Sequence, residues 1–293
     1  MGWRGVAGAV HAWHGRIALQ LWHAGRVSHR RLQVDAAPPV APSAIRAGGV
    51  KVLVLQDDGT PALVDADDPR PLETDEIPGI VLQYVDAAHR ADRAGFDMIE
   101  IDASGGYLLH QFMATGTNRR TDECGSVGNR VRLVVEVMEA VSGVLGANRV
   151  GIRLSPGFGD IEDDERETSA LHLARELKRI GIAYVQLADA DAALRRALRE
   201  AYDGAIIASG NKTAEEADAA IRRGEANAVA FGRAFVANPD LVERLEAGGG
   251  GRRRAEAGAP LAEADPATLH GGGEKDYTDY PALDDAQRGK GDD

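Results

Sequence analysis

Six short apolar runs, separated by segments of helical periodicity, constrain this chain more than any other feature. They lie at 17–22, 96–101, 150–154, 183–187, 205–208 and 228–231. Strands that are apolar along both faces are typical of parallel sheets covered by helices, because a sheet with one face in water shows alternation. The repeat therefore predicts an α/β fold with a parallel sheet built from βαβ units.

Local signals predict two helix starts and one hairpin. Thr74 is the predicted N-cap of a helix whose first turn is acidic, and Thr213 with Glu216 forms a capping-box pattern. The long segment between the first two runs holds apolar residues at 50–55 and 62–64 on either side of an Asp-Gly turn. We expect a surface hairpin there.

The composition changes near residue 248. Residues 1–247 contain all six apolar runs, and 44% hydrophobic residues over the whole chain can sustain one substantial core. We therefore expect one incomplete barrel domain over 1–247 and a Gly-, Arg- and acid-rich tail over 248–293. The arginines at 252–254 could contact an acidic partner or could belong to a solvated linker.

Charge and cysteine content exclude several classes of protein. A formal net charge of −12 argues against binding to a nucleic-acid backbone, because nothing offsets the repulsion. Cys124 is the only cysteine and cannot form an internal disulfide, and no apolar run has the length of a membrane span. The first residues lack a signal-peptide pattern. We expect a cytoplasmic protein without membrane contact, and no metal ligands are predicted.

Two consecutive apolar runs end in a glycine beside a polar residue. The first gives Gly210-Asn211 and the second gives Gly232-Arg233. Phosphate sites of (β/α) barrels form after the last strands, where glycine allows backbone N–H groups to approach an anion and an arginine adds a charged donor. The alternative is that both glycines serve tight turns and that Arg233 pairs with a local carboxylate.

Arg153 lies at the end of the run 150–154, where a charge needs a partner. A flavin edge would serve as that partner, and so would an ion pair with Asp102 or Glu100. This residue alone does not decide between them.

Several longer stretches resemble one enzyme family. They are ALQLWHAGRVSH at 18–29, GFDMIEIDASGGYLLHQFMATGTNRRTDECGSVGNR at 95–130, VGIRLSP at 150–156, ASGNKTAEEA at 208–217, VAFGRAFVANPDL at 229–241 and YTDYP at 277–281. In this order and spacing they resemble the Old Yellow Enzyme family of flavin-dependent ene-reductases. The resemblance implies a parallel (β/α)8 barrel of the TIM type. It also implies bound FMN, NADPH or NADH as hydride donor, and a small activated alkene as substrate.

The resemblance also assigns roles to individual positions. It places Gln20 and Arg153 at the flavin ring, and Gly210, Asn211, Gly232 and Arg233 around its phosphate. Tyr107 matches the proton donor, although a buried structural tyrosine is the alternative from local pattern alone. Trp22 matches a pocket-lining aromatic residue, for which core packing is the alternative.

The chain departs from the family pattern on the substrate side. Asp102 and Gly105 stand where relatives have a pair of side-chain donors that stabilise the charge on a substrate oxygen. His270 stands where relatives have a tyrosine, and His110 is expected to be a surface residue. The resemblance begins near Trp3, so we expect the first two barrel strands to be absent and a sheet edge to be exposed.

The sequence is compatible with three functions. The first is an FMN-dependent NAD(P)H oxidoreductase acting on an activated alkene, with Tyr107 as proton donor. The second is a truncated, non-catalytic relative that binds flavin weakly or not at all. The third is a barrel that acts on a phosphorylated metabolite without flavin, against which Gln20 and its surrounding motif argue. The sequence does not determine the oligomeric state.

Overall fold

A computed structural model describes residues 2–126, 128–156, 163–188, 190–210 and 212–249. Its contacts divide the chain into two compact units, Met1–Ile207 and Ala208–Asp293. The predicted tail covers residues 248–293, of which those from 250 onward lie outside the described residues, and its boundary with the barrel domain stays a prediction.

The first unit is built on a parallel sheet. Its strands, in order of adjacency, are β1 (Ala18–Leu21), β6 (Met98–Ala103), β7 (Val150–Leu154), β8 (Tyr184–Leu187) and β9 (Ala205–Ala208), whose last residue opens the second unit. Strands β1 and β6, β6 and β7, and β7 and β8 pair in parallel. Each strand coincides with an apolar run, so the predicted α/β fold with a parallel sheet is confirmed.

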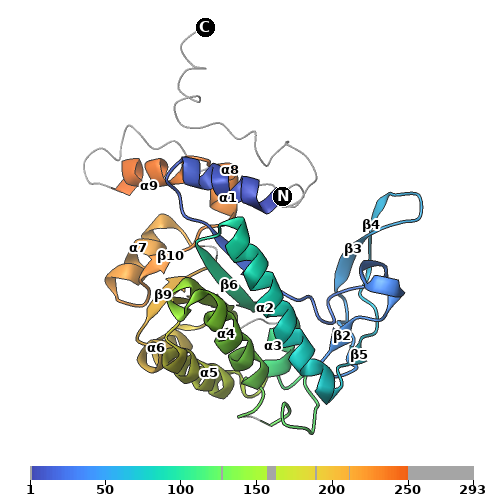
Figure 1. The fold of residues 1–293 in the computed structure, drawn as a ribbon. Helices are drawn as coiled ribbons and strands as arrows, with labels where there is room; N and C mark the ends of the chain where they lie inside the picture. The colour runs from blue at the N-terminus through green and yellow to red at the C-terminus, as the bar shows by residue number, and fades with distance from the viewer. Residues whose placement is uncertain (1, 127, 157–162, 189, 211, 250–293) are drawn as a thin grey trace. The chain divides into compact units, whose positions relative to one another are not determined.

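Helices follow the strands and pack against one another. In the first unit they are α1 (Gly2–Ala12), α2 (Ile77–Ala94), α3 (Leu108–Met113), α4 (Arg132–Leu145), α5 (Arg166–Ile180) and α6 (Ala192–Ala201). Helix α2 lies beside α4, α4 beside α5, and α5 beside α6 (Figure 1). Short 3-10 turns complete the unit at Arg30–Leu32, Val34–Ala36, Thr74–Glu76 and Ala147–Arg149.

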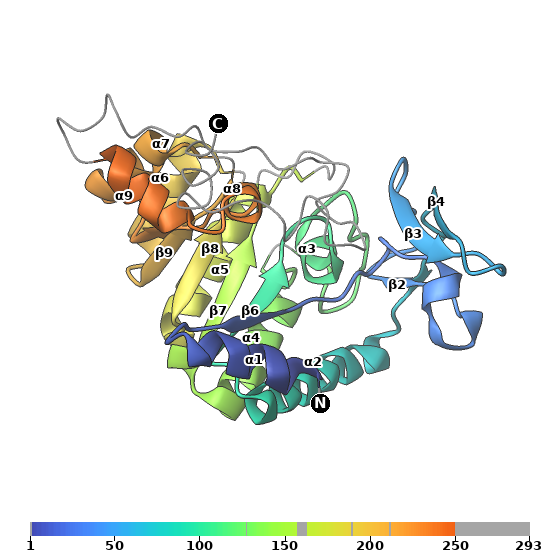
Figure 2. The same cartoon turned by 90° about the horizontal axis from the view of Figure 1, so that it is seen from above.

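The segment between β1 and α2 forms the predicted hairpin. Strands β3 (Lys51–Leu55) and β4 (Pro61–Asp65) pair antiparallel, and they stand apart from the main sheet in both views (Figures 1 and 2). A second small pair, β2 (Val40–Ala41) with β5 (Arg70–Pro71), is parallel. The hairpin keeps its own small core, which includes the buried side chains of Val52 and Val54.

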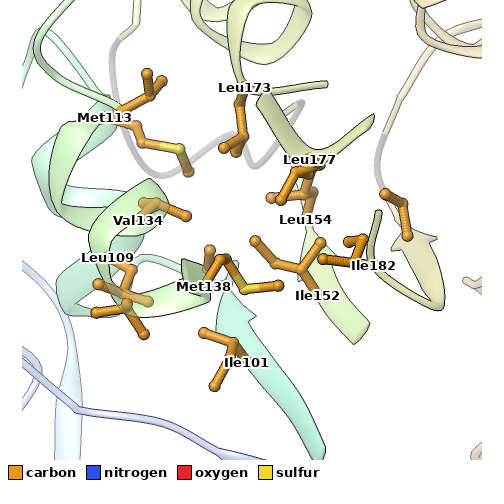
Figure 3. Packing of buried hydrophobic residues seen from close by; sticks show 14 of the residues in the cluster. Ile101, Leu109, Met113, Val134, Met138, Ile152, Leu154, Leu173, Leu177 and Ile182 are labelled. Carbon is orange, nitrogen blue, oxygen red and sulfur yellow. The ribbon is translucent and has the colours of Figure 1, made fainter. Parts of the chain in front are cut away.

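The main core lies between the sheet and the helices. Strand alternation points one set of side chains, including Ile101 and Ile152, toward α4 and α5, where Val134, Met138 and Leu173 are also fully buried (Figure 3). Burying each such side chain stabilises the fold by about 1.5–3 kcal/mol. This face therefore supplies most of the hydrophobic stabilisation of the first unit.

The predicted N-cap at Thr74 is wrong. The 3-10 turn Thr74–Glu76 has Glu73 as its N-cap, with a capping box between Glu73 and Glu76, and α2 follows with Glu76 as its N-cap. The hydroxyl group of Thr74 instead donates to Asp122 at 2.7 Å. A contact 48 residues away along the chain thus takes the side chain that the local pattern assigned to capping.

The second unit contains β10 (Ala228–Val229) and the helices α7 (Ala214–Arg222), α8 (Arg233–Ala237) and α9 (Leu241–Gly249). Thr213 and Glu216 form the predicted capping box at the start of α7. The N–H group of Ala230 donates to the carbonyl of Ala208 at 2.8 Å. The turns that follow β9 and β10 therefore begin next to each other.

Candidate functional site

The face of the sheet opposite the helices is polar. Gln20, Glu100, Gly151 and Tyr184 occupy one level across β1, β6, β7 and β8, because each is the register partner of the next. Asp102 and Arg153 are partners at the next level. Side chains two residues apart in a strand point to the same face, so all of these project away from the apolar core.

At the first level Gln20 contacts Glu100. The amide Nε2 of Gln20 donates to Oε1 of Glu100 at 2.7 Å. Glu100 is buried, and burial raises the pKa of its carboxyl group, while the hydrogen bond from Gln20 acts in the opposite direction. Gln20 itself is exposed. An exposed amide held by a buried carboxylate is available to a ligand on this face.

At the next level Arg153 is half-buried. Within the described residues its guanidinium group makes no hydrogen bond and no ion pair, although its charge lowers the pKa of Glu100 from a longer distance. Neither of the ion pairs considered from sequence, with Asp102 or with Glu100, is formed among these residues. A half-buried arginine without an ion pair fits an electron-rich ligand edge.

Asp102 turns back onto the chain that follows it. Its Oδ1 accepts from the backbone N–H of Ser104 at 2.9 Å and from the Ser104 hydroxyl at 2.6 Å. The side chain is 5% exposed. Asp102 therefore braces the turn after β6.

The turn itself uses its N–H groups internally. Gly105 donates to the Ser155 hydroxyl at 2.8 Å, Gly106 donates to Nδ1 of His110 at 3.1 Å, and Tyr107 donates to the Ser104 carbonyl at 3.1 Å. Gly105 adopts φ +59°, a left-handed conformation that favours glycine. The turn fixes Tyr107 firmly but leaves none of these three backbone donors for a substrate oxygen.

Tyr107 packs against Trp22 at the end of β1. Their ring centroids are 4.7 Å apart and the planes are tilted by 59°. Trp22 is 55% exposed, so core packing does not describe it, and Tyr107 is half-buried. Burial and the charge of Asp102 raise the pKa of the Tyr107 hydroxyl, and Arg153 partly offsets this. The hydroxyl group therefore stays protonated at neutral pH.

The expectation that His110 is a surface residue is wrong. His110 is 5% exposed, because all six residues of α3 are buried where this short helix packs against β6 and α4. Burial lowers the pKa of His110 to about 4. The imidazole is neutral at physiological pH, as its acceptor role toward Gly106 requires.

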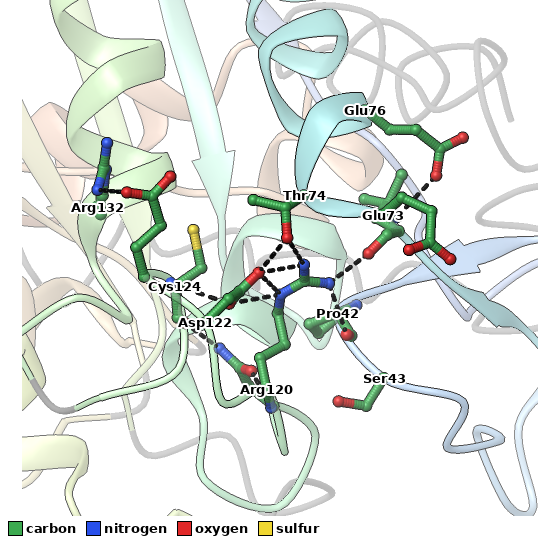
Figure 4. A network of polar contacts seen from close by, with 12 residues as sticks. Pro42, Ser43, Glu73, Thr74, Glu76, Arg120, Asp122, Cys124 and Arg132 are labelled. Carbon is green, nitrogen blue, oxygen red and sulfur yellow. Dashed lines mark hydrogen bonds and ion pairs between the residues drawn. The ribbon is translucent and has the colours of Figure 1, made fainter.

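A polar cluster around Arg120, which the sequence did not reveal, holds the loop after α3 in place (Figure 4). The Arg120 guanidinium group pairs with Asp122 and donates to the carbonyls of Pro42 and Leu72. This arginine holds the pKa of Asp122 well below its usual range. The cluster ties the loop to the segments on either side of the hairpin, far away in sequence.

The predicted phosphate turns lie in the second unit. Gly210 adopts φ +114°, and an added Cβ at either Gly210 or Gly232 would meet open space. Arg233 is exposed and makes no hydrogen bond or ion pair within the part of the chain that the structure describes. Open glycine turns beside an unpaired arginine fit an anion. Asn211 and His270 lie outside the described residues.

The donor set of the first unit fits a flavin ring. Gln20 offers an acceptor and a donor, Arg153 offers a positive charge without an ion pair among the described residues, and both belong to the polar face of the sheet. Among the described residues no cluster of His, Cys, Asp and Glu is arranged to hold a metal ion. None of the helices in these residues has the length and apolar character needed to span a membrane.

The parallel sheet, the helices on its apolar face and the polar opposite face define an α/β protein of the (β/α) barrel type. The model of the NADH:flavin oxidoreductase / NADH oxidase family matches residues 1–250. The chain belongs to this family, which includes the Old Yellow Enzymes, and it is an oxidoreductase. The predicted family is confirmed.

Relatives and solved structures agree with this assignment. 12-Oxophytodienoate reductase 2 of Arabidopsis thaliana is 35% identical over 302 residues, which cover 96% of this chain and 75% of the relative. A probable flavin mononucleotide-dependent alkene reductase of Leishmania infantum is 37% identical over 294 residues, covering 96% of this chain and 76% of that protein. The structure of morphinone reductase in complex with tetrahydroNAD superposes with a TM-score of 0.90 at 50% identity, covering 97% and 77% of the two chains.

Proposed function

We propose that this chain is an FMN-dependent ene-reductase that transfers hydride from NADH or NADPH to a small activated alkene, with Tyr107 as proton donor. The observation that carries the proposal is the guanidinium group of Arg153, which has no ion pair among the described residues, on the polar face that also presents Gln20. The Leishmania relative, described as a probable alkene reductase, and the morphinone reductase structure with tetrahydroNAD support it.

The roles follow from the chemistry of each side chain. FMN, when bound, supplies the capacity to accept hydride from a nicotinamide and to pass it to carbon. Arg153 provides a positive charge for the electron-rich side of the ring, and the Gln20 amide provides an acceptor and a donor. Gly210, Asn211, Gly232 and Arg233 are the proposed phosphate-binding residues.

Tyr107 is the proposed source of the proton. Its raised pKa keeps the hydroxyl group protonated, and the turn that follows β6 holds its backbone in place. As hydride reaches the β-carbon of the alkene, the Tyr107 hydroxyl delivers a proton to the α-carbon. The exposed ring of Trp22 is the proposed wall against which the substrate packs.

A second candidate is a non-catalytic relative. The observation that favours it is the closed hydrogen bonding of the turn at 104–107, where Asp102 has replaced a donor and Gly105 carries no side chain. Such a site would bind the cofactor without stabilising the charge that develops on a substrate oxygen.

The visible absorption spectrum of the purified protein separates the two. A flavin band that bleaches with NADH or NADPH without oxygen, and returns on adding an enone, supports the ene-reductase. A band that bleaches but does not return supports the second candidate. A colourless protein that takes up no added FMN contradicts the ene-reductase and also supports the second candidate. Tyr107→Phe should lower alkene reduction without changing the rate of bleaching, as expected for a proton donor.

A further inference from the structure

Glu100 is a buried carboxyl group that the proposed mechanism does not use. It is 6% exposed and lies in the middle of the polar face. The groups that face it are Gln20 from β1, Tyr184 from β8, and the charges of Arg153 and Asp102 on β7 and on its own strand. Burying a carboxyl group costs free energy unless hydrogen bonds compensate, so its partners indicate what it does.

The contact with Gln20 gives that reason. The two ends of a glutamine amide have nearly the same shape, but one end donates and the other accepts. A carboxylate only accepts, so Glu100 selects the Nε2 end of Gln20, as the 2.7 Å contact records. The other end, Oε1, together with the second hydrogen on Nε2, then remains for a ligand.

A pair of one acceptor and one donor matches the chemistry of a flavin. The imide edge of the ring carries an N–H donor between two carbonyl acceptors, so a correctly turned amide can make two hydrogen bonds there. A reversed amide would oppose donor to donor and acceptor to acceptor. The orientation of Gln20 therefore matters for binding, although the overall shape of the site does not depend on it.

Tyr184 and Gly151 support Glu100 from the other side. The Tyr184 ring crosses β7 at Gly151, where an added Cβ would lie 2.3 Å from a ring atom. The Tyr184 hydroxyl lies near enough to Glu100 to lower the pKa of that carboxyl group. A glycine in the middle of a strand, which weakens a strand in general, thus makes room for a side chain that reaches Glu100.

We infer that Glu100 is a positioning residue for FMN: by binding Nε2 of Gln20, it presents the amide in the one orientation that suits the imide edge of the flavin. This inference rests on the proposed function. Glu100 acts through Gln20 and does not itself contact the flavin, so its effect must disappear when the Gln20 amide is removed.

A double-mutant cycle on FMN affinity tests this. The dissociation constant is measured by flavin fluorescence on the apoprotein for wild type, Glu100→Gln, Gln20→Ala and the double variant. We expect Glu100→Gln to weaken binding about fivefold and Gln20→Ala about tenfold. The double variant should bind about as weakly as Gln20→Ala alone, because the two residues act as one unit.

Control variants separate positioning from general damage. Glu139→Gln, at an exposed ion pair with Arg179, makes the same chemical change on α4 and should leave FMN affinity unchanged. Tyr184→Phe should weaken binding about twofold, since it removes support for Glu100 but leaves the Gln20 contact. The visible flavin band should shift in Glu100→Gln, because the contact of Gln20 with the ring changes. A purely structural defect would instead lower occupancy without changing the band.

The outcomes are distinct. Equal losses from Glu100→Gln in the wild-type and Gln20→Ala backgrounds, or wild-type affinity in Glu100→Gln, overturn the inference while the proposed function stands. If the wild-type chain binds no FMN, the proposed function fails and the inference fails with it.

Discussion

The two faces of the parallel sheet in the first unit differ in what their side chains contact. On one face Ile101, Ile152 and their neighbours are fully buried under α4 and α5. On the other face Gln20 is exposed, Arg153 is half-buried with no ion pair in the described part of the chain, and Glu100 is buried but hydrogen-bonded. The same strands therefore use alternate residues for stability and for chemistry, so substitutions on the two faces should have separable effects.

The largest effect is expected on the covered face. Ile152→Ala should lower the free energy of unfolding by about 2–5 kcal/mol, because it leaves a cavity in a closely packed core. Denaturant unfolding measures this. Leu53→Ala, at a 59% exposed hairpin position, is the matched control and should change stability by less than about 0.5 kcal/mol. Equal losses in both variants would contradict the contrast between covered and open positions.

The covered side also holds a titratable group, His110. Its pKa is lowered to about 4 in the folded protein, whereas an unfolded histidine titrates near pH 6.5. Between these values the unfolded chain binds the proton and the folded chain does not. Stability is therefore complete above about pH 6.5 and decreases as the pH falls toward 4, by about 3 kcal/mol in all.

His110→Gln isolates this contribution, since a glutamine oxygen can still accept from the N–H group of Gly106. The variant should show a flatter dependence of unfolding free energy on pH between 6.5 and 4. Denaturant midpoints at three pH values in this range measure it, and parallel curves for the two proteins would exclude His110 as the source.

On the open face the effect should be on ligand binding, with little effect on stability. Arg153→Ala should weaken FMN binding by about ten- to hundredfold, because a hydrogen bond to a charged group contributes about 1.5–3 kcal/mol. Arg175→Ala, at an exposed position on α5, is the control. A loss of melting temperature in Arg153→Ala without a change in affinity would place Arg153 among the structural residues.

The substrate end of the open face should respond to restored donors. Asp102→His with Gly105→Asn should raise the rate of enone reduction about tenfold, since it removes a negative charge and adds donors. Asparagine tolerates the φ of +59° at position 105, and its Cβ would lie 3.2 Å from the Tyr107 ring, which must shift slightly. Gly105→Asn alone is the control, and an unchanged rate with bound flavin would show that these donors do not limit turnover.

The smallest effect is expected in the second unit. Arg233 is exposed, so its contribution to phosphate binding is screened by water. Arg233→Ala should weaken FMN binding about fivefold, and the loss should shrink as salt is added. Lys212→Ala, a neighbouring basic residue, serves as the comparison. Unchanged flavin content in purified Arg233→Ala would contradict its role in phosphate binding.

The sequence predicted the strands, the hairpin and the helix start at Thr213 because each depends on neighbouring residues. The six apolar runs became strands, the Asp-Gly turn became a hairpin, and Thr213 with Glu216 became a capping box. Hydrophobic period, turn chemistry and capping depend on residues a few positions apart. The family and the parallel fold were also predicted from the sequence.

The environment of each polar side chain depended on residues far away in the chain. Thr74 was assigned to capping but binds Asp122, 48 residues later, and His110 was placed at the surface but is buried. Gln20 and Glu100 are 80 residues apart, and no local pattern links them. Strand order and register bring such pairs together, and burial then sets their pKa values. The sequence thus determined which strands and helices form, while the tertiary structure decided which polar groups meet, because hydrogen bonds and desolvation act through space and not along the chain.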